Sequence, residues 1–448
     1  MSRESEVLGQ LKVIIDPDLG KDIVSLGFIK ELSVSDAGAV SFAIELTTPA
    51  CPVKEKFRAD AEAVVRKLAW VTDVDVTMTA QAKRAGNPLE KAAEGLKQVK
   101  HIIAVASCKG GVGKSTVAVN LAASLMNAGA QVGIFDADVY GPSLPTMVST
   151  DNFEGLYQRQ GLILPIESKG LKLMSFAYAS QATGGGPAVM RGPMVTQIIN
   201  QLLTGTNWGE LDYLVIDMPP GTGDIQLTLS QIIPITASIL VTTPQEISFV
   251  DVVKGLQMFD KLKIPTVAAV ENMAYFICDN CDKEHRIFGS GAMDKLTMQF
   301  GMTNVVSMPI DPAVCEHSDH GTPIVIAQPD GPVAAKYREL ADMVVREVAK
   351  VTHGGIAVPT VVYEPEVGIH FTPVDGETST IAARNLRLAC KCAHCIEEMT
   401  GRPLLDPATV PADIAPTTLD PMGNYAVTIN WSDGHASIYP YDALAALA

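Results

Sequence analysis

The composition of a phosphate-binding loop is found in nine consecutive residues, Cys108-Lys109-Gly110-Gly111-Val112-Gly113-Lys114-Ser115-Thr116. An apolar run over residues 101–106 precedes the loop and an alanine-rich run over residues 117–125 follows it, which predicts a buried parallel strand and then a helix. Glycines let backbone N–H groups converge on phosphate oxygens, and the helix N-terminus adds the positive end of its dipole. Lys114 is expected to reach the β- and γ-phosphates, and the Ser115 hydroxyl to bind Mg²⁺. The loop therefore predicts that residues 109–116 bind a nucleotide.

Polar side chains at the carboxyl ends of later strands are the candidates for completing this nucleotide site. Apolar runs predict strands over residues 131–135, 211–217, 238–245 and 266–273. Asp136 and Asp138 follow the first of these strands, Asp217 ends the second, and Asn272 lies at the end of the last. A carboxylate at Asp217 can hold a water on Mg²⁺, and the amide of Asn272 can pair with adenine. The alternatives are a helix cap or solvated turn for Asp136 and Asp138, and an Asx turn for Asn272.

A second kind of chemistry is indicated by the CxxC sequence Cys278-Asp279-Asn280-Cys281, six residues beyond Asn272. Two thiolates are half of what a tetrahedral zinc ion or a [4Fe–4S] cluster requires. No second CxxC lies within residues 99–350, so the most economical completion is a second copy of the pair across a two-fold axis. A redox disulfide and a zinc ion that bridges a dimer are the alternatives.

Three cysteines within six residues, Cys390, Cys392 and Cys395, are hard to explain as packing alone. Together with one distant histidine they would form a Cys₃His set, which is typical of structural zinc. Iron–sulfur ligation by the same thiolates is the alternative. The clustering of cysteines favours metal ligation in a reducing compartment over a disulfide framework.

The remaining cysteines stand alone in the sequence. Cys51 is expected at a strand-to-helix turn, where a helix dipole would lower the pKa of its thiol, and the alternative is a small buried apolar residue. Cys315 is expected in a loop as a structural thiol. Cys108 replaces the glycine that opens a standard phosphate-binding loop, so one permissive backbone position is lost.

Length and charge limit the functions that the chain can have. Its 448 residues predict two to four domains with ample apolar content for their cores. The formal net charge of −16 argues against a nucleic-acid partner, which requires a basic face. No run of about 18 apolar residues predicts a membrane span, and residues 1–6 have neither a signal-peptide core nor the character of a transit segment.

The pattern of apolar residues predicts an α/β protein with three domains. Residues 1–81 predict a small α/β domain, with a first helix that extends to Ile15 and a second over residues 53–68. A linker over residues 82–98, with a short charged helix before Lys100, leads to residues 99–350, where strands and helices alternate around a mostly parallel sheet. A second linker over residues 351–365 precedes a small β-rich domain over residues 366–448.

The extra lysine of the phosphate-binding loop, Lys109, resembles that of the MinD/ParA/nitrogenase-iron-protein class of P-loop NTPases. The resemblance implies that Lys109 reaches across an ATP-bridged homodimer to the partner's nucleotide, and that Lys109 and Lys114 act in catalysis. It also implies that Asp138 orients the attacking water, that Asp136 supports Mg²⁺ or a switch, and that Asn272 contacts adenine.

Residues 217–224 and 190–195 closely resemble the Mrp/ApbC-type ATPases within that class. This resemblance implies a labile [4Fe–4S] cluster that Cys278 and Cys281 hold between two subunits. Residues 16–19, 25–29 and 46–52 resemble the PaaD-like domain found with iron–sulfur assembly proteins, which implies a transient ligand role for Cys51. The last domain resembles the γ-butyrobetaine hydroxylase N-terminal-like domain, which implies zinc bound by Cys390, Cys392, Cys395 and His435.

The order of the three domains resembles the plastid iron–sulfur scaffolds of the Mrp family, of the high-chlorophyll-fluorescence type. This resemblance implies slow ATP hydrolysis coupled to the transfer of [4Fe–4S] clusters to apo-proteins in the chloroplast stroma, photosystem I among them. The transit segment would then be absent from this sequence, and a prokaryotic protein of this kind would be cytoplasmic. Three other functions stay open: a MinD/ParA-like positioning ATPase, a nucleotide-gated electron donor, and a scaffold that binds ATP without hydrolysing it.

Overall fold

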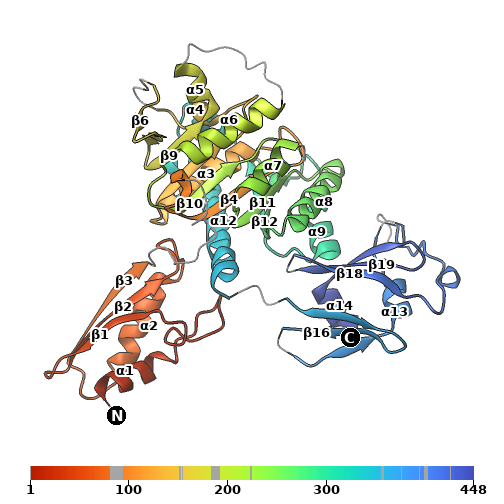
Figure 1. Cartoon of the computed structure of the whole chain (residues 1–448), viewed down its shortest axis with the longest axis horizontal. Helices are drawn as coiled ribbons and strands as arrows, with labels where there is room; N and C mark the ends of the chain where they lie inside the picture. Colours follow the sequence, from red (N-terminus) through yellow and green to blue (C-terminus); the bar gives the residue numbers. More distant parts are fainter. Residues whose placement is uncertain are drawn as a thin grey trace. The chain divides into compact units, whose positions relative to one another are not determined.

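The computed structural model describes residues 2–80, 94–150, 153, 155–182, 192–221, 224–354, 358–374, 376–392, 394–397, 402–423 and 425–447 (Figure 1). Contacts divide the chain into two compact units. The first comprises Met1–Ala106, Gly113–Ala237 and Asp311–Gly354, and the second comprises Ser107–Val112, Ser238–Ile310 and Gly355–Ala448. Most of the predicted linker 82–98 lies outside the described residues. So do Met190 and Arg191 of the motif over residues 190–195, and Thr222 and Gly223 of the motif over residues 217–224.

The first unit begins with a small α/β domain in which two helices pack on a three-stranded sheet. Strands β1 and β2 are antiparallel, and β2 and β3 are parallel. Phe42 and Ile44 of β2 share a buried core with Phe57 and Ala61 of α2, as the alternation in β2 and the helical spacing in α2 require. The elements are α1 (Arg3–Leu11), β1 (Ile29–Val34), β2 (Ala39–Leu46), α2 (Lys54–Val65) and β3 (Asp73–Ala80).

Helix α1 ends at Leu11, so the prediction that this helix extends to Ile15 is wrong. Asp16 explains the early end, because its Oδ1 accepts hydrogen bonds from the backbone N–H groups of Asp18 and Leu19 and builds a turn. Pro17 also disfavours helical backbone at the residue before it. Ile15 consequently lies outside the helix with 53% of its surface exposed.

The larger part of the first unit contains a run of parallel strands in the order β4-β10-β5-β9, with β8 as an antiparallel neighbour of β9. Every residue of β5 and β10 is buried, as expected for strands of a parallel sheet that is covered on both faces. The strands are β4 (Val99–Ala106), β5 (Val132–Asp136), β6 (Gln158–Arg159), β7 (Leu162–Ile163), β8 (Ile166–Ser168), β9 (Leu171–Ser175) and β10 (Leu211–Asp217).

Helices of the first unit connect and cover these strands. The alanines of α3 are buried, which lets α12 pack closely against it. The helices are α3 (Lys114–Asn127), α4 (Leu144–Met147), α5 (Phe176–Ala182), α6 (Gly192–Gly205), α7 (Asp224–Ile232), α10 (Pro312–Asp319), α11 (Ile324–Ala327) and α12 (Pro332–Ala349). A 3₁₀ turn over Glu94–Leu96 stands where the charged helix before Lys100 was expected, and a π-helical turn over Lys350–Gly354 follows α12.

Cys315 lies in α10 and not in a loop, so that prediction is wrong. The Asp311 side chain caps α10 by accepting a hydrogen bond from the N–H of Ala313, and Pro312 takes the first helical position. The start signal of this helix is therefore present in the sequence.

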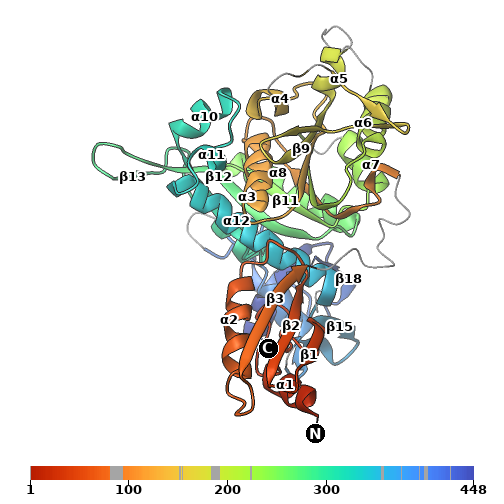
Figure 2. The same ribbon diagram turned by 90° about the vertical axis from the view of Figure 1, so that its left-hand side faces the viewer.

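The second unit contains β11 (Ala237–Thr242), β12 (Thr266–Ile277), β13 (Glu284–His285) and β14 (Val305–Ile310), with helices α8 (Glu246–Lys261) and α9 (Ala292–Phe300). β12 runs parallel to β11 and β14, and forms an antiparallel hairpin with β13. In Figure 2 this hairpin extends as a long finger. The strand predicted to end at residue 273 continues to Ile277, so Asn272 lies within β12 and not at its end.

The C-terminal part of the second unit is β-rich, as predicted. It has two three-stranded antiparallel sheets around one apolar core that includes Ile429 and Trp431. The elements are β15 (Thr360–Glu364), β16 (Gly368–Thr372), β17 (Ser379–Ile381), α13 (Ala383–Leu388), a 3₁₀ turn (Pro407–Thr409), β18 (Pro416–Met422), β19 (Ala426–Trp431), β20 (Ala436–Pro440) and α14 (Tyr441–Leu447).

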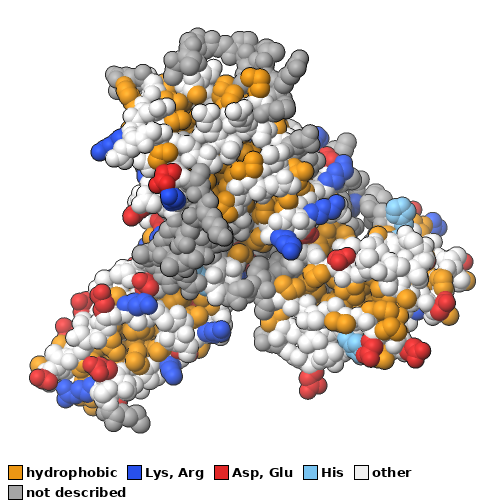
Figure 3. Space-filling model, viewed as in Figure 1, with side chains coloured by type: hydrophobic (Ala, Val, Ile, Leu, Met, Phe, Trp, Pro, Cys, Tyr) orange, Lys and Arg blue, Asp and Glu red, His pale blue; other side chains and the backbone are white. Residues whose placement is uncertain are grey.

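The fold class is therefore α/β, with a mostly parallel central sheet, a small N-terminal domain and a small β-rich C-terminal domain. Among the helices of the described residues, none has the length and apolar character to cross a bilayer. Figure 3 shows Asp and Glu side chains interspersed with Lys and Arg over one face.

Candidate nucleotide and metal sites

The phosphate-binding loop connects β4 to α3 as predicted. Gly111 and Gly113 have φ angles of 79° and 86°, in the left-handed region that favours glycine. Gly113 is the N-cap of α3, and within the described chain no side chain caps the first turn of this helix. Its first N–H groups are therefore suited to an anion such as a phosphate.

Lys114 and Asp217 form a buried ion pair at the start of α3 and the end of β10. Their side chains are only 7% and 6% exposed. Burial raises the pKa of Asp217, and the Lys114 ammonium opposes that rise. The Ser115 hydroxyl lies 3.4 Å from the Lys114 Nζ, so the lysine, the hydroxyl and the carboxylate converge as phosphate and Mg²⁺ binding requires.

Asp136 is tied to the loop that follows β5. Its two oxygens accept hydrogen bonds from the backbone N–H groups of Asp138 (3.0 Å), Ser143 (3.1 Å) and Leu144 (3.2 Å), and from the Ser175 hydroxyl (3.2 Å). Burial, with a further contribution from the Asp217 charge, raises the pKa of Asp136 to about 7. These bonds attach Asp136 to the loop that follows β5, and its support of Mg²⁺ or of a switch stays a prediction.

Asp138 lies two residues beyond β5 and shapes the turn that follows. Its Oδ1 accepts hydrogen bonds from the N–H groups of Tyr140 (3.2 Å) and Gly141 (3.1 Å). Asp138 therefore has the turn role that the sequence analysis gave as the alternative. The turn holds its carboxylate at the carboxyl-terminal edge of the sheet. The orientation of an attacking water by Asp138 stays a prediction.

In the second unit, Asn272 contacts the phosphate-binding loop directly. Its Nδ2 donates a 2.9 Å hydrogen bond to the backbone oxygen of Val112, and 9% of the residue is exposed. The amide therefore joins β12 to the loop and does not form an Asx turn. Lys109 is exposed, as a residue that reaches a partner subunit must be, and the roles of Lys109 and Asn272 toward a nucleotide stay predictions.

The Cys108 side chain packs against α8 at Gly255. A Cβ atom added to Gly255 of that helix would lie 2.6 Å from the Cys108 sulfur, so the side chain occupies space that only a glycine leaves. Burial raises the pKa of the Cys108 thiol to about 11. The side chain that replaces the usual glycine of the loop is thus a packing group.

Cys278 and Cys281 lie in the turn between β12 and β13. The backbone N–H of Cys278 donates a 3.0 Å hydrogen bond to the carbonyl oxygen of Lys283, and the carbonyl oxygen of Cys278 accepts a 2.9 Å bond from the N–H of Asp282. These two bonds close a tight turn that is called the knuckle below. Backbone N–H groups of Asn280 and Cys281 face the Cys278 sulfur and lower the pKa of its thiol. Cys281 is exposed and Cys278 is half-buried, and the binding of a metal by this pair stays a prediction.

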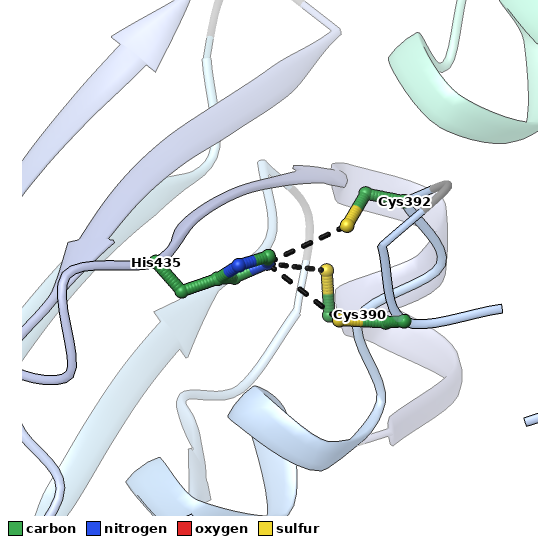
Figure 4. A group of neighbouring side chains, drawn as sticks. Cys390, Cys392 and His435 are labelled. Atoms are coloured by element: carbon green, nitrogen blue, oxygen red, sulfur yellow. Dashed lines mark hydrogen bonds between the residues drawn. The ribbon is translucent and has the colours of Figure 1, made fainter. Parts of the chain in front are cut away.

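The C-terminal domain brings together all four predicted zinc ligands. Figure 4 labels three of them, Cys390, Cys392 and His435. The Nε2 of His435 lies 3.4, 3.5 and 3.7 Å from the sulfurs of Cys390, Cys392 and Cys395. A tetrahedral zinc ion with Zn–S of about 2.3 Å and Zn–N of about 2.0 Å places N and S about 3.5 Å apart. All four ligand atoms lie within 4.8 Å of one another, so the set fits a single ion.

The histidine of this cluster favours the neutral form that a metal requires, whereas the cysteines must lose their protons when a metal binds. Burial lowers the pKa of His435, which keeps the imidazole neutral, and burial raises the pKa of Cys390 to about 12. Neutral imidazole is the form that ligates, and a metal must displace the thiol protons as it binds. By contrast, a [4Fe–4S] cluster attaches each thiolate to a separate iron, which requires ligands spaced more widely than around one ion.

Arg387 is a residue of this site that the sequence did not reveal. It lies on α13, three residues before Cys390, and donates a hydrogen bond to the sulfur of Cys395. An arginine three residues before a cysteine is too common in sequences to indicate a role. Its side chain is directed toward the ligands only by the packing of the folded domain.

The burial and the thiol pKa of Cys51 differ from what its position in the sequence suggested. Helix α2 begins at Lys54, and the Cys51 side chain packs against the core of the N-terminal domain. Burial raises the pKa of its thiol, so the expectation that a helix dipole lowers this pKa is wrong. The buried apolar interpretation is favoured.

Three known families match successive parts of the chain. Residues 98–345 match the ParA-type NUBPL iron-transfer P-loop NTPases, residues 4–78 match an iron–sulfur cluster assembly protein family, and residues 365–445 match the γ-butyrobetaine hydroxylase-like N-terminal family. Two relatives are chloroplastic Fe–S cluster assembly factors named HCF101. The one from Oryza sativa subsp. japonica is 50% identical over 446 residues, with 98% of this chain and 82% of the relative covered. The one from Arabidopsis thaliana is 49% identical over 448 residues, with the same coverage of 98% and 82%.

A further relative is an iron–sulfur cluster carrier protein from a Synechocystis species. It is 41% identical over 347 residues, which cover 77% of this chain and 97% of the relative. The first family covers more than half of the chain, and the HCF101 relatives match nearly all of it. The chain therefore belongs to the iron-transfer P-loop NTPases that serve as iron–sulfur cluster assembly factors.

Proposed function

We propose that this protein is an ATP-dependent scaffold and carrier that loads a labile [4Fe–4S] cluster and transfers it to apo-proteins. The observation that carries the proposal is the continuity of β12. Asn272, within this strand, contacts the phosphate-binding loop, and the end of the strand at Ile277 leads into the hairpin with Cys278 and Cys281. The phosphate-binding loop is therefore connected to the thiols through one strand.

Two copies of the chain would share the cluster. Each hairpin offers two thiols, whereas the cluster takes four. Large apolar side chains flank the pair: Ile277, Ile287 and Phe288 are 50%, 59% and 37% exposed. Such side chains on a projecting hairpin favour contact with a second protein surface. The exposed Lys109 supports the same homodimer, with its ammonium on the nucleotide of the partner.

Within each copy, Lys114 would hold the β- and γ-phosphates, and Ser115 and Asp217 would hold Mg²⁺. Mg²⁺ supplies charge neutralisation for phosphoryl transfer. Asp138 would orient the attacking water, and the bonds from Asp136 to Ser143 and Leu144 would transmit the γ-phosphate state to the loop. Slow hydrolysis is then coupled to opening of the dimer and release of the cluster.

The two cysteine sites would bind different metals. The fit of Cys390, Cys392, Cys395 and His435 to one tetrahedral ion supports structural zinc there. The chloroplastic names of the HCF101 relatives support a location in the chloroplast, and we place the protein in the stroma with photosystem I among its recipients.

The test compares phosphate release with cluster transfer to an apo-[4Fe–4S] acceptor protein under anaerobic conditions. Asp138→Asn should lower phosphate release about 100-fold or more, the range for a lost acid–base group. The Asn oxygen can still accept the hydrogen bonds of Tyr140 and Gly141, so nucleotide affinity and iron loading should stay unchanged. ATP-stimulated transfer should fall with hydrolysis, and Asp330→Asn, at an exposed distant acid, should match wild type.

The alternatives give different results. Transfer at the same rate with and without ATP would contradict the coupling. Reduction of the acceptor by a cluster that stays on the protein would identify an electron donor, and unchanged phosphate release in Asp138→Asn would remove Asp138 from catalysis.

A further inference from the structure

A buried guanidinium lies beside the Cys₃His cluster. Arg387, on α13, is only 4% exposed. Its Nη1 donates a 3.4 Å hydrogen bond to the sulfur of Cys395, and its Nε donates a 2.9 Å hydrogen bond to Oδ2 of Asp433. A buried charge is costly unless it is paired, so this arginine must have a stabilising set of partners, and one of them is the sulfur of a metal ligand.

The bonds of Arg387 connect two ligands that are 40 residues apart. Oδ1 of Asp433 accepts a 3.0 Å hydrogen bond from the backbone N–H of His435. One continuous chain therefore runs from the Cys395 sulfur through Arg387 and Asp433 to His435. It joins the cysteine segment after α13 to the turn between β19 and β20, the two segments that carry the ligands.

The charge of the site gives the arginine a second role. Three thiolates, a neutral imidazole and a divalent ion sum to one negative charge, which is unfavourable inside the protein. Cys390 and Cys395 are only 1% and 3% exposed, so water cannot solvate that excess. An N–H group of a guanidinium directed at one sulfur stabilises a thiolate and compensates the charge.

We propose that Arg387 is a positioning residue of the C-terminal metal site, which orients the sulfur of Cys395 and, through Asp433, fixes the turn that carries His435. This inference rests on the zinc site proposed above. Arg387 does not itself bind the ion.

The test uses the full chain with Cys278→Ser and Cys281→Ser, so that the C-terminal set is the remaining cysteine cluster. Zinc affinity is measured by competition with a chromophoric chelator, and the thiolate-to-metal charge-transfer band is recorded after substitution with Co²⁺. Arg387→Met should weaken zinc binding about 10- to 100-fold, the range for lost outer-shell partners, and should shift the band. Arg387→Lys should restore part of the zinc affinity. Lysine keeps the positive charge but cannot donate to Asp433 and Cys395 with the planar geometry of a guanidinium.

Asp433→Asn tests the same chain of bonds with a smaller change and should give a smaller loss of affinity. The control is Arg402→Met, at an arginine whose side chain is 72% exposed in the same domain. Affinity within twofold of wild type and an unshifted Co²⁺ band in Arg387→Met would overturn the inference. His435→Ala tests the zinc site separately, since undiminished zinc binding in that variant would contradict the site itself.

Discussion

The two cysteine clusters of this protein differ in the number of their side chains and in how deeply these are buried. The hairpin site has two thiols, and Cys281 is exposed in the turn between β12 and β13. The C-terminal site has four ligands, and two of its cysteines are almost fully buried. An incomplete, accessible ligand set suits a cluster that is shared and released, whereas a complete, enclosed set suits an ion that is kept.

The sites are also organised by different means. At the hairpin, backbone N–H groups of the knuckle face the Cys278 sulfur, so the site depends on local chain geometry. At the C-terminal site, side chains from distant segments meet, and Arg387 and Asp433 connect them. A local site can form and open without unfolding the domain around it, while a site built from distant segments stabilises the domain.

The largest expected difference between the sites is in thiol reactivity. In cluster-free protein that retains zinc, Cys278 should react with iodoacetamide about 100-fold faster than Cys390 or Cys395, because the buried thiols are inaccessible and metal-bound. The lowered pKa of Cys278 means that its thiolate forms at lower pH. Its alkylation rate should therefore reach half of its plateau at a lower pH than that of free cysteine.

Peptide mass spectrometry of samples alkylated at several pH values measures these rates. Equal rates at the two sites, or a Cys278 curve displaced to higher pH, would remove the distinction between an open and a closed site.

A smaller effect is expected from the apolar side chains beside the hairpin thiols. Ile287→Ser removes a side chain that is 59% exposed in one copy and that the proposed dimer would bury. Loss of about 1.4 kcal/mol of apolar burial would weaken the cluster-loaded dimer about 10-fold without changing the stability of the single chain. Leu404→Ser, at a leucine that is 48% exposed in the C-terminal domain, is the matched control.

Sedimentation of both variants with and without cluster gives the dimer affinity. Dimers of equal strength in Ile287→Ser and wild type would place the interface elsewhere.

Features set by local sequence were predictable from the chain. β10 has the predicted bounds of Leu211–Asp217, because an uninterrupted apolar run defines a buried parallel strand. Gly111 and Gly113 of the predicted phosphate-binding loop have positive φ angles, which glycine favours. The four C-terminal ligands meet as the resemblance implied, although their spacing alone could not select His435.

Features set by tertiary contacts were not predictable. The extension of β12 to Ile277 includes an irregular register against β14 and a positive φ of 58° at Met273, which breaks the sequence pattern of a strand. Burial raises the pKa of the Cys51 thiol, and the packing of neighbouring elements determines how deeply a thiol is buried. Arg387 acquires its partners only when α13 and the turn after β19 pack together.

The central claim is that the hairpin cysteines hold the transferable cluster while the C-terminal set holds zinc. Anaerobic reconstitution followed by iron, sulfide and zinc analysis of Cys278→Ser/Cys281→Ser tests it most directly, with Cys315→Ser, at another exposed cysteine, as the control. Wild type and the control should contain about two irons per chain, or four per dimer, and about one zinc. The double variant should lose all of the iron and keep its zinc, and full iron retention in that variant would contradict the account.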